Sequence, residues 1–455
     1  MCRAIYTYSF LFLFLFWCSC NKITFLNTKP NTSLHVPSTP QDCQALLDDD
    51  WVMNGYGNSG YPYLPELSGD DLYLEDADYN KSALVDQETY IWRQQIDMGD
   101  ALSDWDLPYK AVATSNTVLA ILGKIPSSYQ TATWNGLKGS ALFYRAYAFF
   151  ELARVFAPVY DSTTAGTDSG IPLPQSADIN QKASRATVQQ TYDQILGDLR
   201  QAEGLLPKDS VWLPTRPSPA AVYALFSRVF LSVGNYVLAG RYADSCLQLK
   251  HELMLYDTVS KTKIFPFYRT NPEMIFCAAY FPGGPAAPFR SHTDSNLFRS
   301  YEQNDLRKQL FFKYGDYFVG SYDQDGYRFG GLAVDEVLLT RSECYARAGN
   351  TAAAMADLNH LLETRWAAGT FIPYTAVDAG DALRQILMER RKQLLFRGTR
   401  WADLRRLNKD SRTAVTLSRT INGAVYTLSP KDPRWTLPLP GYILKFNPDM
   451  PQNIR

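Results

Sequence analysis

Residue types that often carry out catalysis are present in this chain, but their spacing does not assemble a site. Acidic pairs such as Asp70-Asp71, or Asp104 with Asp106, could in principle cleave a glycoside, although neighbouring carboxylates are common in any sequence. No metalloprotease, nucleophile-elbow, phosphate-loop or dinucleotide-binding pattern occurs. The histidines lie on separate segments with no second histidine at metal-ligand spacing: His35, His251, His292 and His360. We therefore expect a protein that is not an enzyme and uses neither metal nor cofactor.

Aromatic side chains offer a different chemistry, which is recognition. The chain holds 29 tyrosines, 24 phenylalanines and 9 tryptophans, many of them outside helical patterns. Flat sugar faces stack on aromatic rings, while sugar hydroxyls pair with polar side chains, backbone groups and bridging water. This composition favours a shallow, wet binding surface.

The net charge and the spacing of the cysteines argue against further classes of protein. The formal net charge is −1, so the surface offers no electrostatic footprint for nucleic acid. Cysteines of the main body are widely scattered without a Cys-x-x-Cys pair, which argues against a zinc site or a dense disulfide framework. We expect four buried free thiols: Cys43, Cys246, Cys277 and Cys344.

The sequence pattern predicts that the elements that must position a binding surface are mostly amphipathic helices. Between Thr187 and Leu206, apolar residues recur at intervals of 4, 3, 4, 3 and 4, which keeps one face buried. Thr187 and Gln190 form a capping-box pattern, and Pro207 ends the run. The pattern predicts one helix over this range.

Two later helix pairs repeat one arrangement. One pair turns at Gly234-Asn235 and the other at Gly349-Asn350, with an alanine five residues past each glycine. A small residue at that position lets two antiparallel helices approach closely, as in tetratricopeptide-type hairpins. We expect a mainly α fold built from such pairs, including an earlier one at 107–122 and 134–156.

Long irregular segments separate the helix pairs, at 51–65, 157–180, 256–301 and 313–332. Loops of this length are usually functional or carry small appended structure. The last stretch, 425–455, contains six prolines, and we expect it to cross the surface without a helix.

The N-terminus reads as a lipoprotein signal. Residues 1–19 carry one charge, Arg3, before an apolar run that is too short to span a bilayer. Small Ser19 precedes Cys20, which predicts cleavage between them and acylation of Cys20, for example by palmitate. The proline- and threonine-rich residues that follow, to position 41, predict an extended tether.

One C-terminal segment resembles a known family. Glu389-Arg-Arg-Lys-Gln-Leu-Leu-Phe-Arg-Gly-Thr-Arg-Trp-Ala-Asp-Leu-Arg-Arg406 is similar to the signature of SusD-like (RagB/SusD) outer-membrane lipoproteins of Bacteroidetes. The Arg145-Ala146 helix and the terminal Leu437-Pro438-Leu439-Pro440 agree in order and position. Arg390 falls on the apolar face of its helix, so we expect its guanidinium to be paired, with Glu389 and Asp403 nearby in sequence. The signature is therefore interpreted as architectural and not as a catalytic site.

The resemblance implies a fold, a location and a partner. It implies a SusD-like fold with a lipid anchor on the outer membrane, facing outward, and a TonB-dependent SusC-like barrel to which the protein delivers an oligo- or polysaccharide. It divides the chain into a signal peptide (1–19), a tether (20–41), an N-terminal region (42–250) and a C-terminal region (251–455).

The resemblance also places ligand contacts on loops of the N-terminal region and on insertions in the C-terminal half. The residues that those segments offer are Trp105, Asp71, Tyr73, Tyr280, Phe281 and Tyr322. Trp105 matches a stacking tryptophan that the family often presents, and its alternative role is packing of the first helix pair. A peptide ligand within the same transport role, and a helical-repeat scaffold without a small ligand, are the alternatives that stay open.

Overall fold

The computed structural model describes residues 36–56, 63–99, 102–126, 128, 130–178, 180–182, 184–208, 212–280, 282–324 and 326–455. Residues Pro40–Arg455 form one compact unit. The predicted signal peptide, Cys20 and most of the tether lie outside the described residues. The predicted region boundary at 250/251 follows helix α12 (Tyr236–Leu249) and stays a prediction. Among the described helices, none is long and apolar enough to cross a membrane.

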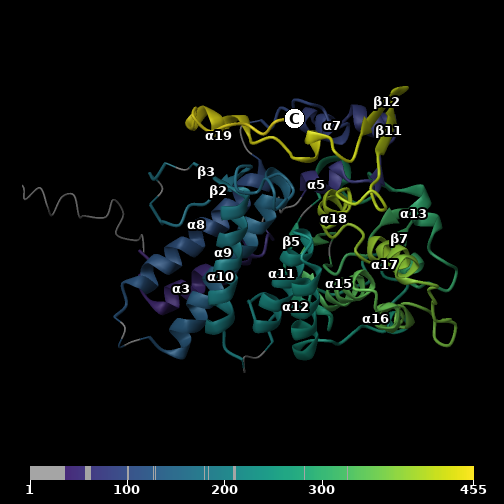
Figure 1. Cartoon of the computed structure of the whole chain (residues 1–455), viewed down its shortest axis with the longest axis horizontal. Coiled ribbons are helices and arrows are strands. Elements are labelled where there is room, and N and C mark those ends of the chain that lie inside the picture. The colour runs from purple at the N-terminus through teal and green to yellow at the C-terminus, as the bar shows by residue number, and fades with distance from the viewer. Residues whose placement is uncertain are drawn as a thin grey trace, which may run out of the picture. The chain divides into compact units, whose positions relative to one another are not determined.

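Three long helices form one side of this unit (Figure 1). Helix α9 (Ala132–Phe156) packs between α8 (Ser103–Gly123) and α10 (Val188–Leu205). Nearly every residue of α9 after Leu137 is buried, so apolar residues occur on all of its faces, and its charged residues Arg145, Glu151 and Arg154 are buried as well. The predicted capping box of α10 is confirmed, because Thr187 accepts from the Gln190 backbone and the Gln190 side chain accepts from the Thr187 backbone.

Two helix hairpins follow, and their turns explain the repeated sequence pattern. They are α11 (Pro219–Ser232) with α12 (Tyr236–Leu249), and α15 (Val334–Arg347) with α16 (Thr351–Glu363). Gly234 and Gly349 both have φ near 80°, the left-handed conformation that glycine adopts without strain. Asn235 and Asn350 then accept hydrogen bonds from the first turns of the next helices.

The alanines past each turn lie where the paired helices touch. Ala239 and Ala354 are fully buried. The Ser227 hydroxyl donates to the Ala239 carbonyl at 3.0 Å, and the Ser342 hydroxyl donates to the Ala354 carbonyl at 2.8 Å. The two hairpins are thus structural repeats, and the predicted tetratricopeptide-type pairs are confirmed.

The signature segment forms α17 (Ala379–Gln393) and α18 (Arg400–Leu407) inside the unit. Arg390 Nε donates to Asp403 Oδ2 at 2.8 Å, so one of its two expected partners is confirmed. Glu389 instead accepts from Arg307 at 2.7 Å and from Lys392 at 2.9 Å. These ionic groups are buried and paired with one another, which supports the architectural interpretation.

The remaining helices are short. They are α3 (Pro40–Leu47), α4 (Asp50–Met53), α5 (Tyr63–Ser68), α6 (Asp76–Asn80), α7 (Leu84–Tyr90), α13 (Ser295–Arg299), α14 (Arg307–Phe311) and α19 (Gly441–Phe446). Helix α19 makes the prediction of a helix-free C-terminal stretch wrong. Prolines flank this helix at positions 440 and 448 but do not interrupt it.

Short antiparallel strand pairs fasten the irregular segments. They are β1 (Leu72–Tyr73) with β6 (His292–Thr293), β2 (Ser169–Pro172) with β3 (Arg185–Thr187), β4 (Met274–Phe276) with β10 (Leu332–Ala333), β5 (Ala279–Tyr280) with β9 (Arg328–Phe329), β7 (Phe312–Lys313) with β8 (Tyr317–Phe318), and β11 (Leu417–Ile421) with β12 (Ala424–Leu428).

The expectation of four buried free thiols is confirmed at Cys43, Cys246, Cys277 and Cys344.

Candidate functional site

A row of contacting rings lies where strands β1, β6 and β8 meet the loops beside them. The ring of Tyr73 stacks on His292, with centroids 5.0 Å apart and planes 17° apart. His292 contacts Tyr317 at 4.8 Å, Tyr317 contacts Phe289 at 6.0 Å, and Phe289 contacts Tyr314 at 5.8 Å. We call these five residues the aromatic surface.

The outer members of the aromatic surface are open to solvent. Tyr314 is 74% exposed, Phe289 41% and Tyr73 36%. Phe289 and Tyr314 also have positive φ angles of 65° and 52°, a conformation that is unfavourable for a bulky side chain. Such strain persists where the surrounding structure imposes it, and it is concentrated at functional sites.

The strand register explains how distant segments meet here. In the β1–β6 pair, Tyr73 lies directly opposite His292, so their rings share one face of the ribbon. The hairpin of β7 and β8 turns at Tyr314-Gly315, where Gly315 has φ 98°. Strand β6 contacts β8, which brings the β7–β8 hairpin to this ribbon.

Polar groups lie among the rings. His292 Nδ1 is 2.8 Å from Asp316 Oδ1, and His292 Nε2 is 3.4 Å from the Tyr317 hydroxyl. The Thr293 hydroxyl donates to the Asp316 carbonyl at 2.7 Å, which joins β6 to the residue just before β8. Exposed rings with hydroxyl, imidazole and carboxylate groups beside them can stack on a sugar and bond its hydroxyls. Over the described part of the chain, no group of three or more metal-ligating side chains occurs.

Of the predicted ligand-binding residues, Tyr73 lies in the aromatic surface and Trp105 lies in the core. The Trp105 ring is 3% exposed and packs between Tyr109 at 4.9 Å and Phe156 at 5.1 Å. This is the packing role that the sequence left open as the alternative. A ligand contact by Trp105 stays a prediction and would require a rearrangement of the first helix pair.

Three other predicted residues, Asp71, Tyr280 and Tyr322, are buried and have partners inside the protein. Asp71 is buried and accepts from Arg391 Nε at 2.8 Å, while Tyr280 is buried with its hydroxyl donating to the Phe396 carbonyl at 3.1 Å. Tyr322 is also buried, and burial raises its pKa well above the usual value, so it is a neutral hydrogen-bonding group. Phe281 lies outside the described residues. The structure gives Asp71, Tyr280 and Tyr322 internal partners, and ligand contact by them stays a prediction.

Sequence reasoning did not single out Phe289, His292, Tyr314 and Tyr317. They lie in two of the long segments expected to be functional, 256–301 and 313–332, but the sequence does not reveal which rings face outward. The pairing of β1 with β6 joins residues more than two hundred positions apart. The Tyr-Gly turn of a short aromatic hairpin is the one local signal for Tyr314.

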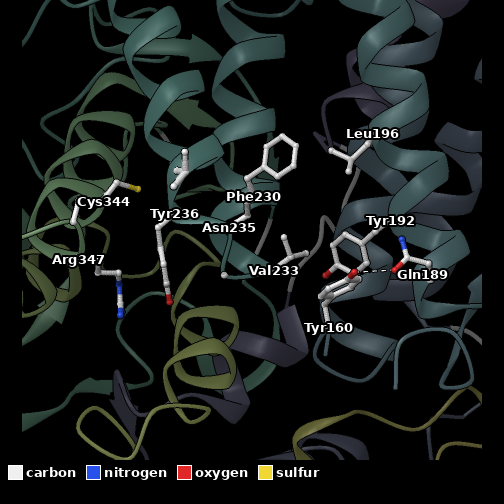
Figure 2. A pocket seen from close by; sticks show the side chains of 13 residues that line it. Tyr160, Gln189, Tyr192, Leu196, Phe230, Val233, Asn235, Tyr236, Cys344 and Arg347 are labelled. Atoms are coloured by element: carbon white, nitrogen blue, oxygen red, sulfur yellow. Dashed lines mark hydrogen bonds between the residues drawn. The ribbon is translucent and has the colours of Figure 1, made fainter. Parts of the chain in front are cut away.

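A separate pocket lies between α10, the α11–α12 turn and the end of α15 (Figure 2). Its volume is about 630 Å³. Figure 2 shows tyrosines on both sides, Tyr236 beside Arg347 on one and Tyr160 with Tyr192 on the other. The Tyr160 hydroxyl donates to Gln189 Oε1 at 2.8 Å.

Comparison with known proteins finds relatives for most of this chain. Residues 24–231 match a family model described as starch-binding and associating with the outer membrane, and residues 334–454 match the model of the SusD family. The SusD-like protein P38 of Formosa agariphila is 24% identical, over 70% of this chain and 74% of that protein.

Solved structures share the fold. A SusD superfamily protein from Bacteroides thetaiotaomicron has a TM-score of 0.75 at 20% identity, covering 92% of this chain and 100% of that chain. A laminarin-binding SusD-like protein has a TM-score of 0.64 at 18% identity, covering 90% of this chain and 97% of that chain. At these identities the likeness shows the fold alone.

Proposed function

Because this chain belongs to the SusD family, whose members are outer-membrane-associated binding proteins, we propose that it captures a glycan on the aromatic surface. The observation that carries the proposal is the row of five contacting rings with exposed outer members at Tyr314, Phe289 and Tyr73. A stacked aromatic contact contributes about 0.5–1.5 kcal/mol beyond area burial, so several rings together support useful affinity.

The mode of action follows from the same chemistry. The rings take the CH faces of the sugar, and the polar groups around His292 and Asp316 bond its hydroxyls. The protein binds and does not cleave, in line with the binding role of the family. The laminarin-binding relative of the same fold supports a polysaccharide as the ligand class.

The proposal extends to location and delivery. An acyl chain on Cys20 would hold the protein at the outer membrane, with the body on a tether of about twenty residues. The partner would be a TonB-dependent SusC-like barrel that receives the captured glycan. Metabolic labelling with a palmitate analogue tests the anchor, and Cys20→Ala should abolish the label.

The test of the binding site uses isothermal titration calorimetry with laminarin, starch and a peptide mixture. Tyr314→Ala and Phe289→Ala should each weaken glycan binding about tenfold, since about 1.4 kcal/mol corresponds to a factor of ten. Phe446→Ala is the matched control, because this ring is also highly exposed, at 82%, but lies on α19.

Four outcomes would contradict the proposal. Glycan affinity that survives the double variant Phe289→Ala/Tyr314→Ala would remove the aromatic surface as the site. Release of shortened glycan by the protein alone would indicate an enzyme. Binding of the peptide mixture only would change the ligand class while the transport role stays, and a chain without any small ligand would fit a helical-repeat scaffold.

A further inference from the structure

The pocket of Figure 2 is distinct from the aromatic surface in both residues and charge. Among the described residues that line it, Arg347 is the one that carries a charge, and no carboxylate lines the pocket. The remaining lining is aromatic, aliphatic and amide: Tyr160, Gln189, Tyr192, Leu196, Phe230, Val233, Gly234, Asn235, Tyr236, Val237, Cys344 and Ala348. A hollow with a cation and no anion in its wall favours a ligand that carries negative charge.

The positive charge of Arg347 is only partly compensated inside the protein. Its Nε donates to Glu343 Oε1 at 2.8 Å, but Glu343 also accepts two bonds from Arg406, at 2.6 and 2.8 Å. Glu343 is therefore shared by two guanidinium groups, although Arg406 also donates to Asp403 Oδ1 at 2.8 Å. Arg347 Nη2 is buried without a hydrogen-bond acceptor in the structure. A buried donor without an acceptor is costly, so a ligand oxygen that reaches Nη2 when the pocket side chains adjust would supply a bond that the protein lacks.

The surroundings hold Arg347 in place at the pocket. Its side chain is 10% exposed and its guanidinium lies 4.2 Å from the ring centroid of Tyr236. Asp410, whose pKa is lowered chiefly by its hydrogen bonds with Arg412 and to a smaller extent by Arg347, is already engaged by the Arg412 guanidinium at 2.7 Å. A positioned guanidinium suits carboxylate or sulfate groups, because its fork of N–H donors matches their oxygens.

The opposite wall suits a sugar ring. Tyr160 and Tyr192 meet edge to face with centroids 5.4 Å apart. The amides of Gln189 and Asn235 lie at the same opening, and Figure 2 shows Phe230 and Val233 between the two walls. A pocket of about 630 Å³ that combines aromatic faces with a few polar groups is of ordinary size for a small ligand.

We propose that this pocket is a second saccharide site that takes an anionic sugar, whose carboxylate or sulfate ester meets Arg347. The inference rests on the proposed glycan-binding function and adds the charge of the ligand to it. The site would hold an acidic residue of a polysaccharide, while the aromatic surface takes ring faces irrespective of charge.

The test measures affinity of the mature chain by calorimetry for three probes: digalacturonate, its methyl ester and a sulfated disaccharide. We expect the acidic probes to bind at least tenfold more tightly than the ester, with affinity that falls as salt rises. Preference for digalacturonate over the sulfated probe would identify a carboxylate ligand, and the reverse would identify a sulfate ester. Equal affinity for digalacturonate and its ester would overturn the proposal.

Amino-acid substitutions test whether the acidic probes bind in this pocket. Arg347→Gln should remove the preference for acidic probes, and Arg347→Lys should keep part of it. Arg384→Gln is the control, since Arg384 is 73% exposed on α17. Because Arg347→Gln could also disturb Glu343, Val237→Glu provides a second approach: Val237 is 66% exposed at the pocket, and a carboxylate there should repel the probes while Val237→Gln does not.

The aromatic surface must be separable from the pocket. Tyr314→Ala should weaken the binding of neutral glycan, while the preferential affinity for digalacturonate over its methyl ester should remain. If Tyr314→Ala abolishes that affinity and Arg347→Gln does not, acidic sugars bind at the aromatic surface, and the pocket proposal fails while the proposed function stands. If neither neutral nor acidic sugars bind anywhere, both fail.

Discussion

Two buried carboxyl groups show how single residues tune the stability of this protein. Asp104 accepts from the Tyr63 and Leu64 backbones at 2.8 and 3.1 Å, which ties the start of α5 to the start of α8. Glu66 accepts from the Gly398 backbone at 2.5 Å, and a second oxygen of each carboxyl has no partner in the structure. Burial raises the pKa of Asp104 to about 7 and that of Glu66 to about 8.

These shifts predict a loss of stability as pH rises from 5 to 8. The folded protein binds more protons than the unfolded chain between the ordinary pKa of each group and its raised value. The free energy of unfolding therefore falls there, by at most about 1.4 kcal/mol per pH unit and group, and levels off above pH 8. Urea unfolding at several pH values measures this slope.

Glu66→Gln should flatten that slope and make the protein more stable than the unaltered chain at pH 8. Glutamine keeps an oxygen for the Gly398 backbone and never ionises. Exposed Glu75→Gln is the control and should leave the slope unchanged. A slope that Glu66→Gln does not alter would mean that Glu66 is not protonated in the folded protein at pH 5–7.

At the scale of elements, the turns between paired helices require a residue that adopts a positive φ angle without strain. Gly349 has φ 80° and open space where a Cβ would stand, so a substitution there is opposed by backbone conformation and not by a clash. Gly349→Ala should lower the free energy of unfolding by about 1 kcal/mol. Gly123→Ala is the matched control, since Gly123 also faces open space but lacks a positive φ. Equal effects of the two substitutions would contradict the role of the turn.

Helices were predictable from this sequence because their signals are local. The capping residues Thr187 and Asn350 and the 3.6-residue periodicity lie within one element, so their positions follow without tertiary information. Two-residue strands carry no such signal, and helix α19 was hidden by the prolines around it. Trp105 illustrates the limit for sites: the sequence places it just ahead of the helix expected at 107–122, but only packing against Phe156 decides that it faces inward.

At the scale of the whole molecule, ion pairs connect the residues just before β1 to helices α17 and α18, next to the aromatic surface. Arg391 on α17 donates to Asp71 Oδ1 at 2.8 Å, one residue before β1. Arg400 on α18 holds Asp70 through two bonds, at 2.6 and 2.8 Å. The Asp71 carbonyl in turn accepts from the Asp294 backbone, at the end of β6. Ion pairs between residues more than three hundred positions apart thus hold β1 in the place where Tyr73 stacks on His292.

Arg391→Gln should therefore weaken glycan binding without any contact between Arg391 and the ligand. The change leaves Asp71 buried without its hydrogen-bonded cation, so we expect a loss of about 1–3 kcal/mol in the free energy of unfolding. We also expect a severalfold loss of glycan affinity, because β1 and Tyr73 lose their anchor. Thermal unfolding and calorimetry with the same glycan measure the two effects.

Arg384→Gln on the same helix separates the anchor from a general effect of lost charge. Arg384 is exposed and pairs with Asp381 one turn away, so both stability and affinity should stay near those of the unaltered chain. The double variant Arg391→Gln/Tyr73→Ala sharpens the result. If Arg391 acts by positioning Tyr73, the double variant should bind no more weakly than Tyr73→Ala alone. Additive losses would show instead that Arg391 and Tyr73 serve the ligand independently.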